Sequence, residues 1–112
     1  MGSTGLIQLP IPAQIAADAG ARVVELGMER EFHEMLGYTQ KAVLRLRSIA
    51  VTLYHDPDEP GQPRVLITAY RAGPELEDDR TEADWSAWQV RTFPPHVCRW
   101  FSFDTAAGHD GR

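Results

Sequence analysis

The sequence has a single cysteine, Cys98, no asparagine, and one lysine, Lys41. A lone thiol cannot form an intramolecular disulfide, so the chain is not a small secreted scaffold held together by disulfides. No apolar run approaches the roughly 20 residues that span a bilayer, and the N-terminal residues lack the basic-then-apolar profile of a signal peptide. We therefore expect a cytoplasmic protein that does not associate with a membrane.

The basic residues are almost all arginine, ten of the 11. An excess of arginine can serve bidentate recognition of phosphate or carboxylate groups. However, GC-rich codons also favour arginine, alanine, glycine and proline over lysine and asparagine, and we interpret the bias in this way, which predicts a high-GC bacterium as the source. The net charge of −5 argues against non-specific binding to nucleic acid or to anionic lipid.

The patterns that carry catalytic or metal chemistry are missing. A structural zinc site needs four ligands in close pairs, and His33-Glu34 lacks the second histidine of a zinc-protease helix. No glycine-rich loop has the spacing that cradles phosphate. Cys98 lies near His96, which could stabilise a thiolate, but a lone cysteine more often packs as a small hydrophobic residue. We expect no catalytic residue, no metal and no cofactor.

The length of 112 residues and the hydrophobic content of 43% are those of one ordinary globular domain. A chain of this size buries roughly 65% of its unfolded surface, which is enough for a single core. Gly2, Gly5 and Pro10 surround a short apolar patch in residues 1–11. We interpret this segment as a loosely ordered lead-in whose residues 6–9 could form a short edge strand. Residues 12–103 would form the domain, and the small and polar residues 104–112 a flexible tail.

Helical spacing runs from Pro12 to about Leu44. One apolar face follows from Ile15, Ala19, Val23 and Leu26, and a second from Met28, Phe32, Met35, Leu36, Thr39 and Val43. The two faces are out of phase at Gly27, and glycine disfavours a helix interior. The pattern predicts two helices that divide at Gly27, with one bent helix as the alternative.

Residues 46–55 and 64–71 alternate in polarity and are rich in β-branched side chains. Turn-forming residues fill positions 56–63 between them, so this region predicts a β-hairpin. One face of the hairpin would carry Ile49, Val51 and Leu53 opposite Val65, Ile67 and Ala69, and we expect the helices to cover it. The other face would carry Ala50, Thr52 and Tyr54 beside Leu66, Thr68 and Tyr70.

Thr81 resembles a helix N-cap, followed by acidic residues that suit the first turn. The helix would extend to about Phe93, where Pro94 and Pro95 end it. A turn at residues 96–99 would lead to a strand at 100–103, parallel to 64–71 because a helix connects the two. The predicted order is α-α-β-β-α-β, an α+β domain with helices on one sheet face.

Acidic and aromatic residues concentrate near the C-terminus. Residues 75–84 hold six acids and one base, so their net charge equals that of the whole chain. Six of the ten aromatic residues lie between positions 85 and 103. They can form the core, but tryptophans are also enriched in binding hot spots. The candidate interface consists of Trp85, Trp88, Trp100, Phe101, Asp78 and Asp79.

The outer hairpin face offers an alternative site for nucleic acid or a small ligand, made of Tyr54, Tyr70, Thr52, Thr68 and Arg47. The net negative charge counts against nucleic acid. By elimination, we expect a non-enzymatic interaction protein: an accessory, antitoxin-like or immunity-like subunit that binds another protein or itself. An enzyme of a type without a recognisable motif is the remaining alternative.

Overall fold

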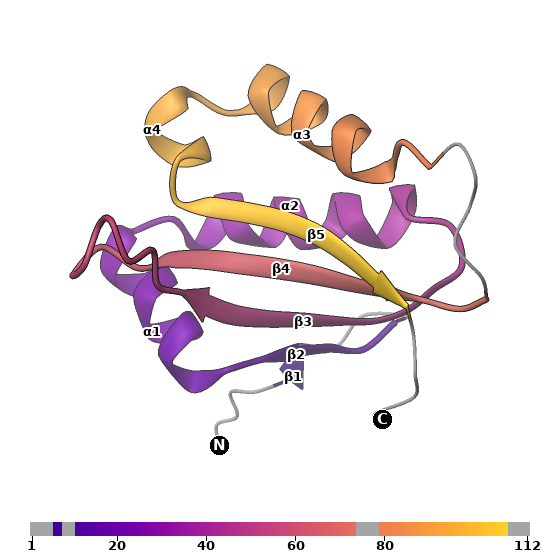
Figure 1. Cartoon of the computed structure of the whole chain (residues 1–112), viewed down its shortest axis with the longest axis horizontal. Coiled ribbons are helices and arrows are strands. Elements are labelled where there is room, and N and C mark those ends of the chain that lie inside the picture. The colour runs from indigo at the N-terminus through magenta and orange to yellow at the C-terminus, as the bar shows by residue number, and fades with distance from the viewer. Residues whose placement is uncertain (1–5, 8–10, 74–78, 108–112) are drawn as a thin grey trace.

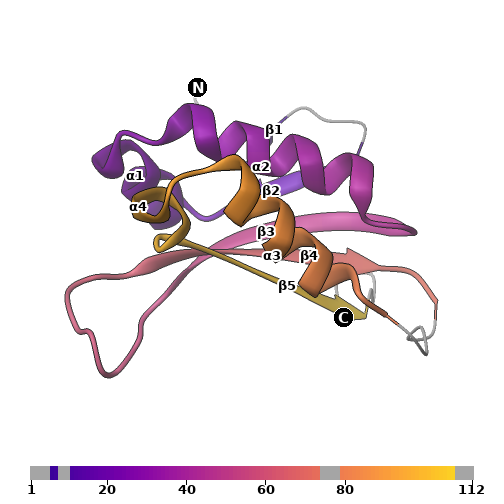
Figure 2. The same cartoon turned by 90° about the horizontal axis from the view of Figure 1, so that it is seen from above.

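The computed structural model describes residues 6–7, 11–73 and 79–107, and in these ranges a mixed sheet carries a layer of helices on one face (Figures 1 and 2). The strands are β1 (Leu6–Ile7), β2 (Ala13–Ile15), β3 (Leu46–Tyr54), β4 (Arg64–Arg71) and β5 (Phe101–Ala107). The helices are α1 (Ala17–Leu26), α2 (Glu29–Ala42), α3 (Thr81–Thr92) and α4 (Pro95–Cys98). The strands lie side by side in chain order, and the predicted α+β class is confirmed.

The predicted hairpin forms the centre of the sheet. Strands β3 and β4 pair antiparallel, with Ile49 opposite Ala69 and Val51 opposite Ile67. These residues alternate along each strand, so every second side chain points toward the helices, and all four are buried. The hairpin and its apolar face are therefore confirmed.

The last strand is longer than the sequence predicts. Strand β5 pairs parallel to β4, with Phe101 opposite Val65 and Ala107 opposite Arg71. The parallel direction is confirmed, but the assignment of residues 104–107 to a flexible tail is wrong. Pairing with β4 supplies hydrogen-bond partners for the backbone of this segment, a long-range stabilisation that its small, polar side chains do not reveal.

The first part of the predicted helix is a strand instead. Ala13–Ile15 form β2, which pairs parallel to β3, with Ala13 opposite Ile49, while Leu6–Ile7 form the edge strand β1 antiparallel to β2. Helix α1 begins only at Ala17, so the predicted helix start at Pro12 is wrong. A strand of three residues is too short to show an alternating pattern, and Ile15 happened to match the spacing of the helix that follows.

Gly27 separates two helices, as the phase shift predicts. Its φ of 68° is left-handed, a conformation that costs glycine little, and its N–H bonds the carbonyl groups of Val23 and Val24. Helix α2 then starts at Glu29. The alternative of one bent helix is excluded.

Helix α3 begins at Thr81 and ends before Phe93, close to the predicted bounds. The assignment of Thr81 as the N-cap is wrong by one position, because Arg80 occupies the cap. Asp79 Oδ1 accepts the Thr81 N–H at 3.0 Å, so the acidic residue two positions earlier provides the hydrogen bond expected from a cap.

The helices lie on one face of the sheet, as Figure 2 shows most clearly. Helices α1 and α2 connect β2 to the parallel β3, and α3 and α4 connect β4 to the parallel β5. Because β3 and β4 are antiparallel and both connections cross the same face in the same lateral direction, the two crossovers have opposite hands. One of them therefore departs from the right-handed rule.

Trp85 lies where α2, α3 and β5 meet. Its ring stacks on Phe103 with the centroids 4.6 Å apart. Its Nε1–H donates to Thr39 Oγ1 at 2.9 Å, and the Thr39 hydroxyl donates in turn to the Met35 carbonyl at 2.7 Å. Thr39 and Trp85 are both buried, so this chain of hydrogen bonds satisfies polar groups that water cannot reach.

Side chains of α3 also cover the outer edge of β5. Gln89 Nε2 donates to the Phe101 carbonyl at 3.1 Å, and Glu82 Oε2 accepts from the Thr105 N–H at 2.9 Å and from its hydroxyl at 3.0 Å. Helix α3 is thereby fixed along the strand by polar contacts as well as by packing.

Within the described ranges, no helix is long and apolar enough to cross a membrane.

We predict that Thr39→Val destabilises the fold by about 1–3 kcal/mol, because the buried Trp85 N–H would lose its acceptor while the side-chain volume stays nearly constant. The matched control is Thr52→Val, the same chemical change at an exposed position, which should shift stability by less than about 0.5 kcal/mol. Urea unfolding of both variants measures the difference, and equal effects would contradict the assigned role of the hydrogen bond.

Candidate interaction surface

The predicted tryptophan interface belongs largely to the core. Trp85 is 2% exposed and Phe101 is 3% exposed, so neither can anchor a partner without opening the domain. Trp88 is partly buried, and its ring stacks on Tyr38 of α2 with 3.9 Å between centroids and an interplanar angle of 2°. Trp85 and Phe101 join the helical layer to the sheet, and Trp88 joins α3 to α2. This is the core role that the sequence left open.

Trp100 is partly buried at the hairpin end of the sheet. The guanidinium carbons of Arg22 and Arg99 lie 4.9 and 4.6 Å from its ring centroid, within cation–π range. Arg22 Nε also donates to the Pro63 carbonyl at 3.1 Å, which joins α1 to the end of the hairpin loop. Trp100 therefore has partners inside its own chain.

Of the predicted acidic residues, Asp78 lies outside the described residues, and Asp79 forms an ion pair with the largely buried Arg71 at the end of β4. The hydrogen bond from Arg71, followed by those from the Thr81 hydroxyl and backbone N–H, holds the pKa of Asp79 well below its usual value. Asp79 is thus an ionised group that ties β4 to the start of α3.

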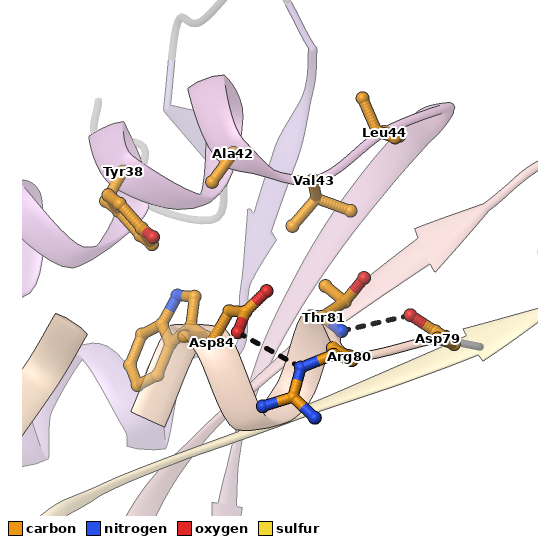
Figure 3. Close-up of a pocket in the computed structure, with 9 residues that line it drawn as sticks. Tyr38, Ala42, Val43, Leu44, Asp79, Arg80, Thr81 and Asp84 are labelled. Atoms are coloured by element: carbon orange, nitrogen blue, oxygen red, sulfur yellow. Dashed lines mark hydrogen bonds and ion pairs between the residues drawn. The ribbon is translucent and has the colours of Figure 1, made fainter. Parts of the chain in front are cut away.

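A pocket of about 380 Å³ opens between the end of α2 and the start of α3 (Figure 3). Its lining consists of Tyr38, Ala42, Val43, Leu44, Asp79, Arg80, Thr81, Asp84 and Trp85. The charged residues balance one another, because Asp79 pairs with Arg71 and Asp84 Oδ1 lies 3.8 Å from Arg80 Nε. Each charged residue of the lining thus has a partner of opposite charge.

The second candidate surface is the face of the sheet away from the helices. We call it the open face; it carries Gln14 of β2, Ser48, Ala50, Thr52 and Tyr54 of β3, Arg64, Leu66, Thr68 and Tyr70 of β4, and Ser102, Asp104 and Ala106 of β5. Among the described elements, no helix packs on it (Figure 2). Tyr54 is 45% exposed, Thr52 is exposed, and Thr68 and Tyr70 are partly exposed.

Arg47 reaches the same region through a β-bulge. Leu46 pairs with Arg71 and Ser48 pairs with Tyr70, so Arg47 is the extra residue between two successive pairs. The bulge places Arg47 beside Ser48, opposite Tyr70, and the residue is exposed. All five residues of the alternative site predicted from sequence thus lie on β3 and β4, at the open face or at its rim.

The sequence did not reveal the contribution of β5 to this face. Asp104 lies in the row formed by Gln14, Ala50 and Thr68. Its Oδ1 is a buried side-chain oxygen without a hydrogen-bond partner in the described part of the chain. The sequence signal for this contribution is weak, because it consists only of the small or polar residues Ser102, Asp104 and Ala106 at alternate positions.

Cys98 lies away from the open face and has partners of its own. Its thiol is 3.5 and 3.6 Å from the carbonyl oxygens of Gln89 and Phe93, and burial raises its pKa. A raised pKa favours the unreactive thiol form.

The described residues contain no group of three or more histidine, cysteine, aspartate or glutamate side chains placed to hold a metal ion.

We predict that Asp79 stabilises the fold only while it is ionised. Because its pKa is lower in the folded state, its contribution is fully present above the unfolded pKa, about 3.9, and is lost as the pH falls through the lower folded value. Asp79→Asn should therefore be less stable than wild type at pH 7, and the difference should shrink below about pH 4. Thermal unfolding across this pH range, with Asp58→Asn in the hairpin loop as the control, measures the effect; a constant difference would contradict it.

Comparison of the chain with protein-family models, with curated proteins and with solved structures gave no match, so its function must be inferred from its own surface.

Proposed function

We propose that this chain is a non-enzymatic accessory subunit of the antitoxin-like or immunity-like kind, which binds a protein partner through the open face of its sheet. The observation that carries the proposal is the one-sided helical layer, which covers one face of the central hairpin and leaves the other without a described element (Figure 2). The tryptophan surface expected from sequence is less suitable, because Trp85 and Phe101 are buried.

The composition of the open face suits a protein partner. Tyr54 and Tyr70 offer large rings with polar tips, a combination enriched in interfaces. Between them lie small residues and hydroxyl groups, including Ala50, Thr68 and Ser102. Small side chains allow close approach of a partner, and the hydroxyl groups can donate or accept hydrogen bonds across an interface.

The same face suits a single-stranded nucleic acid less well. Tyr70 lies opposite Ser48, and Tyr54 is six residues further along β3, so the two rings are about 20 Å apart along the strands. Neighbouring bases could not stack on both. Asp104 adds negative charge between the two ends, and the whole chain is acidic, both of which oppose a phosphate backbone.

We predict that a photo-crosslinking amino acid at Tyr54 captures a protein partner in lysate of the native host. The same group at Val24, which is 61% exposed on α1 of the helical layer, should not capture it. Replacing Tyr70 by alanine should weaken capture at Tyr54 by about tenfold or more, as for a hot-spot residue. The variants with the crosslinking group at Tyr54 or Val24 should keep the wild-type unfolding midpoint, because both side chains are exposed. Circular dichroism should show that the Tyr70→Ala variant is folded.

Equal capture from Tyr54 and Val24, or capture that is insensitive to Tyr70→Ala, would contradict the proposal. If the purified protein instead binds single-stranded oligonucleotides with a strong salt dependence that Tyr54→Ala abolishes, the nucleic-acid function takes its place.

A further inference from the structure

We infer that the open face is occupied by a second copy of this chain, in a symmetric dimer in which Arg47 of each copy pairs with Asp104 of the other. The inference rests on the proposed function, since it names the partner of the same face. Three features of the described residues support it: an incompletely paired carboxylate, an arginine on a bulge, and the relative position of the two.

Asp104 has one carboxylate oxygen that lacks a hydrogen-bond donor among the described residues. Its Oδ1 is buried and, within the described residues, accepts no hydrogen bond. Burial of a carboxylate oxygen without a donor is costly. The residue as a whole is only partly buried. A positive charge of a facing molecule close to this carboxylate would offset part of that cost.

Arg47 is a cation at the rim of the same face. The bulge in β3 places it opposite Tyr70, and the residue is exposed. Arg47 also interacts within its own chain. A guanidinium group has five N–H donors in a planar fork, which is enough to hold an internal contact and to pair with a carboxylate of another molecule.

The positions of the two residues fit a two-fold axis. Arg47 and Asp104 lie two strands apart, about 10 Å across the sheet, and about 8 Å apart along the strand direction. The line that joins them therefore runs at roughly 45° to the strands. A two-fold axis between facing sheets exchanges the two positions when the strands of the copies cross at roughly 90°, which is one of the two angles at which sheets stack.

The same axis brings Tyr70 and Thr68 of one molecule close to Tyr70 and Thr68 of the other. The midpoint between Arg47 and Asp104 falls on β4, between these two residues. A self-complementary patch centred on a tyrosine and flanked by two ion pairs is what an isologous dimer interface requires. Two crossed sheets about four strands wide overlap over roughly 20 Å by 20 Å, which is small for a stable dimer and predicts a reversible one.

The test is a charge exchange followed by sedimentation between roughly 1 μM and 1 mM protein. We expect the wild type to form dimers with increasing concentration. Arg47→Asp alone and Asp104→Arg alone should each raise the dissociation constant about tenfold or more, because like charges would face each other. The double variant Arg47→Asp/Asp104→Arg should restore dimers, since the pair is re-formed with the charges exchanged.

Circular dichroism and the unfolding midpoint of each variant separate loss of dimer from loss of fold. If the folded single variants still dimerise as the wild type does, or if the folded double variant stays monomeric, the ion pair is overturned. A wild type that is monomeric across the whole range overturns the dimer. In that case, capture of a different protein at Tyr54 would still support the proposed function, so the two failures are distinguishable.

Discussion

The burial of Trp85 is the constraint on which the rest of the structure depends. Its ring stacks on Phe103 of β5 and its N–H bonds Thr39 of α2, so one side chain of α3 links both helical connections to the sheet. A tryptophan buried at such a junction needs its N–H satisfied, and Thr39 can satisfy it only while α2 and α3 lie on the same face. This contact therefore holds α2 and α3 on the same face of the sheet.

That arrangement also accounts for the unusual connectivity. With β3 and β4 antiparallel at the centre, two crossovers on one face cannot share a hand. The chain accepts one crossover of the disfavoured hand and gains a continuous helical layer over Ile49, Val51, Val65 and Ile67. Strand β2, which precedes this layer in the chain and pairs with β3, is only three residues long.

The elements with local signals were predictable, and those stabilised by distant partners were not. The hairpin could be predicted because alternating β-branched residues flank a dense turn, and the break at Gly27 because two apolar faces change phase there. Strand β2 and the second half of β5 could not, since parallel pairing joins segments far apart in sequence and leaves little trace in three or four small residues. The same distinction applies to the residues of the candidate site. The positions of Tyr54, Tyr70 and Arg47 followed from the hairpin, whereas Asp104 was assigned to a tail, and the burial of Trp85 required knowledge of its packing.

The polar contacts of α3 with β5 have a consequence for how this protein can assemble. An uncovered edge strand offers its backbone to any extended chain, and sheets that grow in this way have no natural end. Here Gln89 and Glu82 occupy a carbonyl and an N–H that an incoming strand would need. Growth from this edge is therefore obstructed, whereas a contact between faces is complete once two molecules have met. Helix α3, which buries Trp85, thus also protects the β5 edge of the sheet from strand addition.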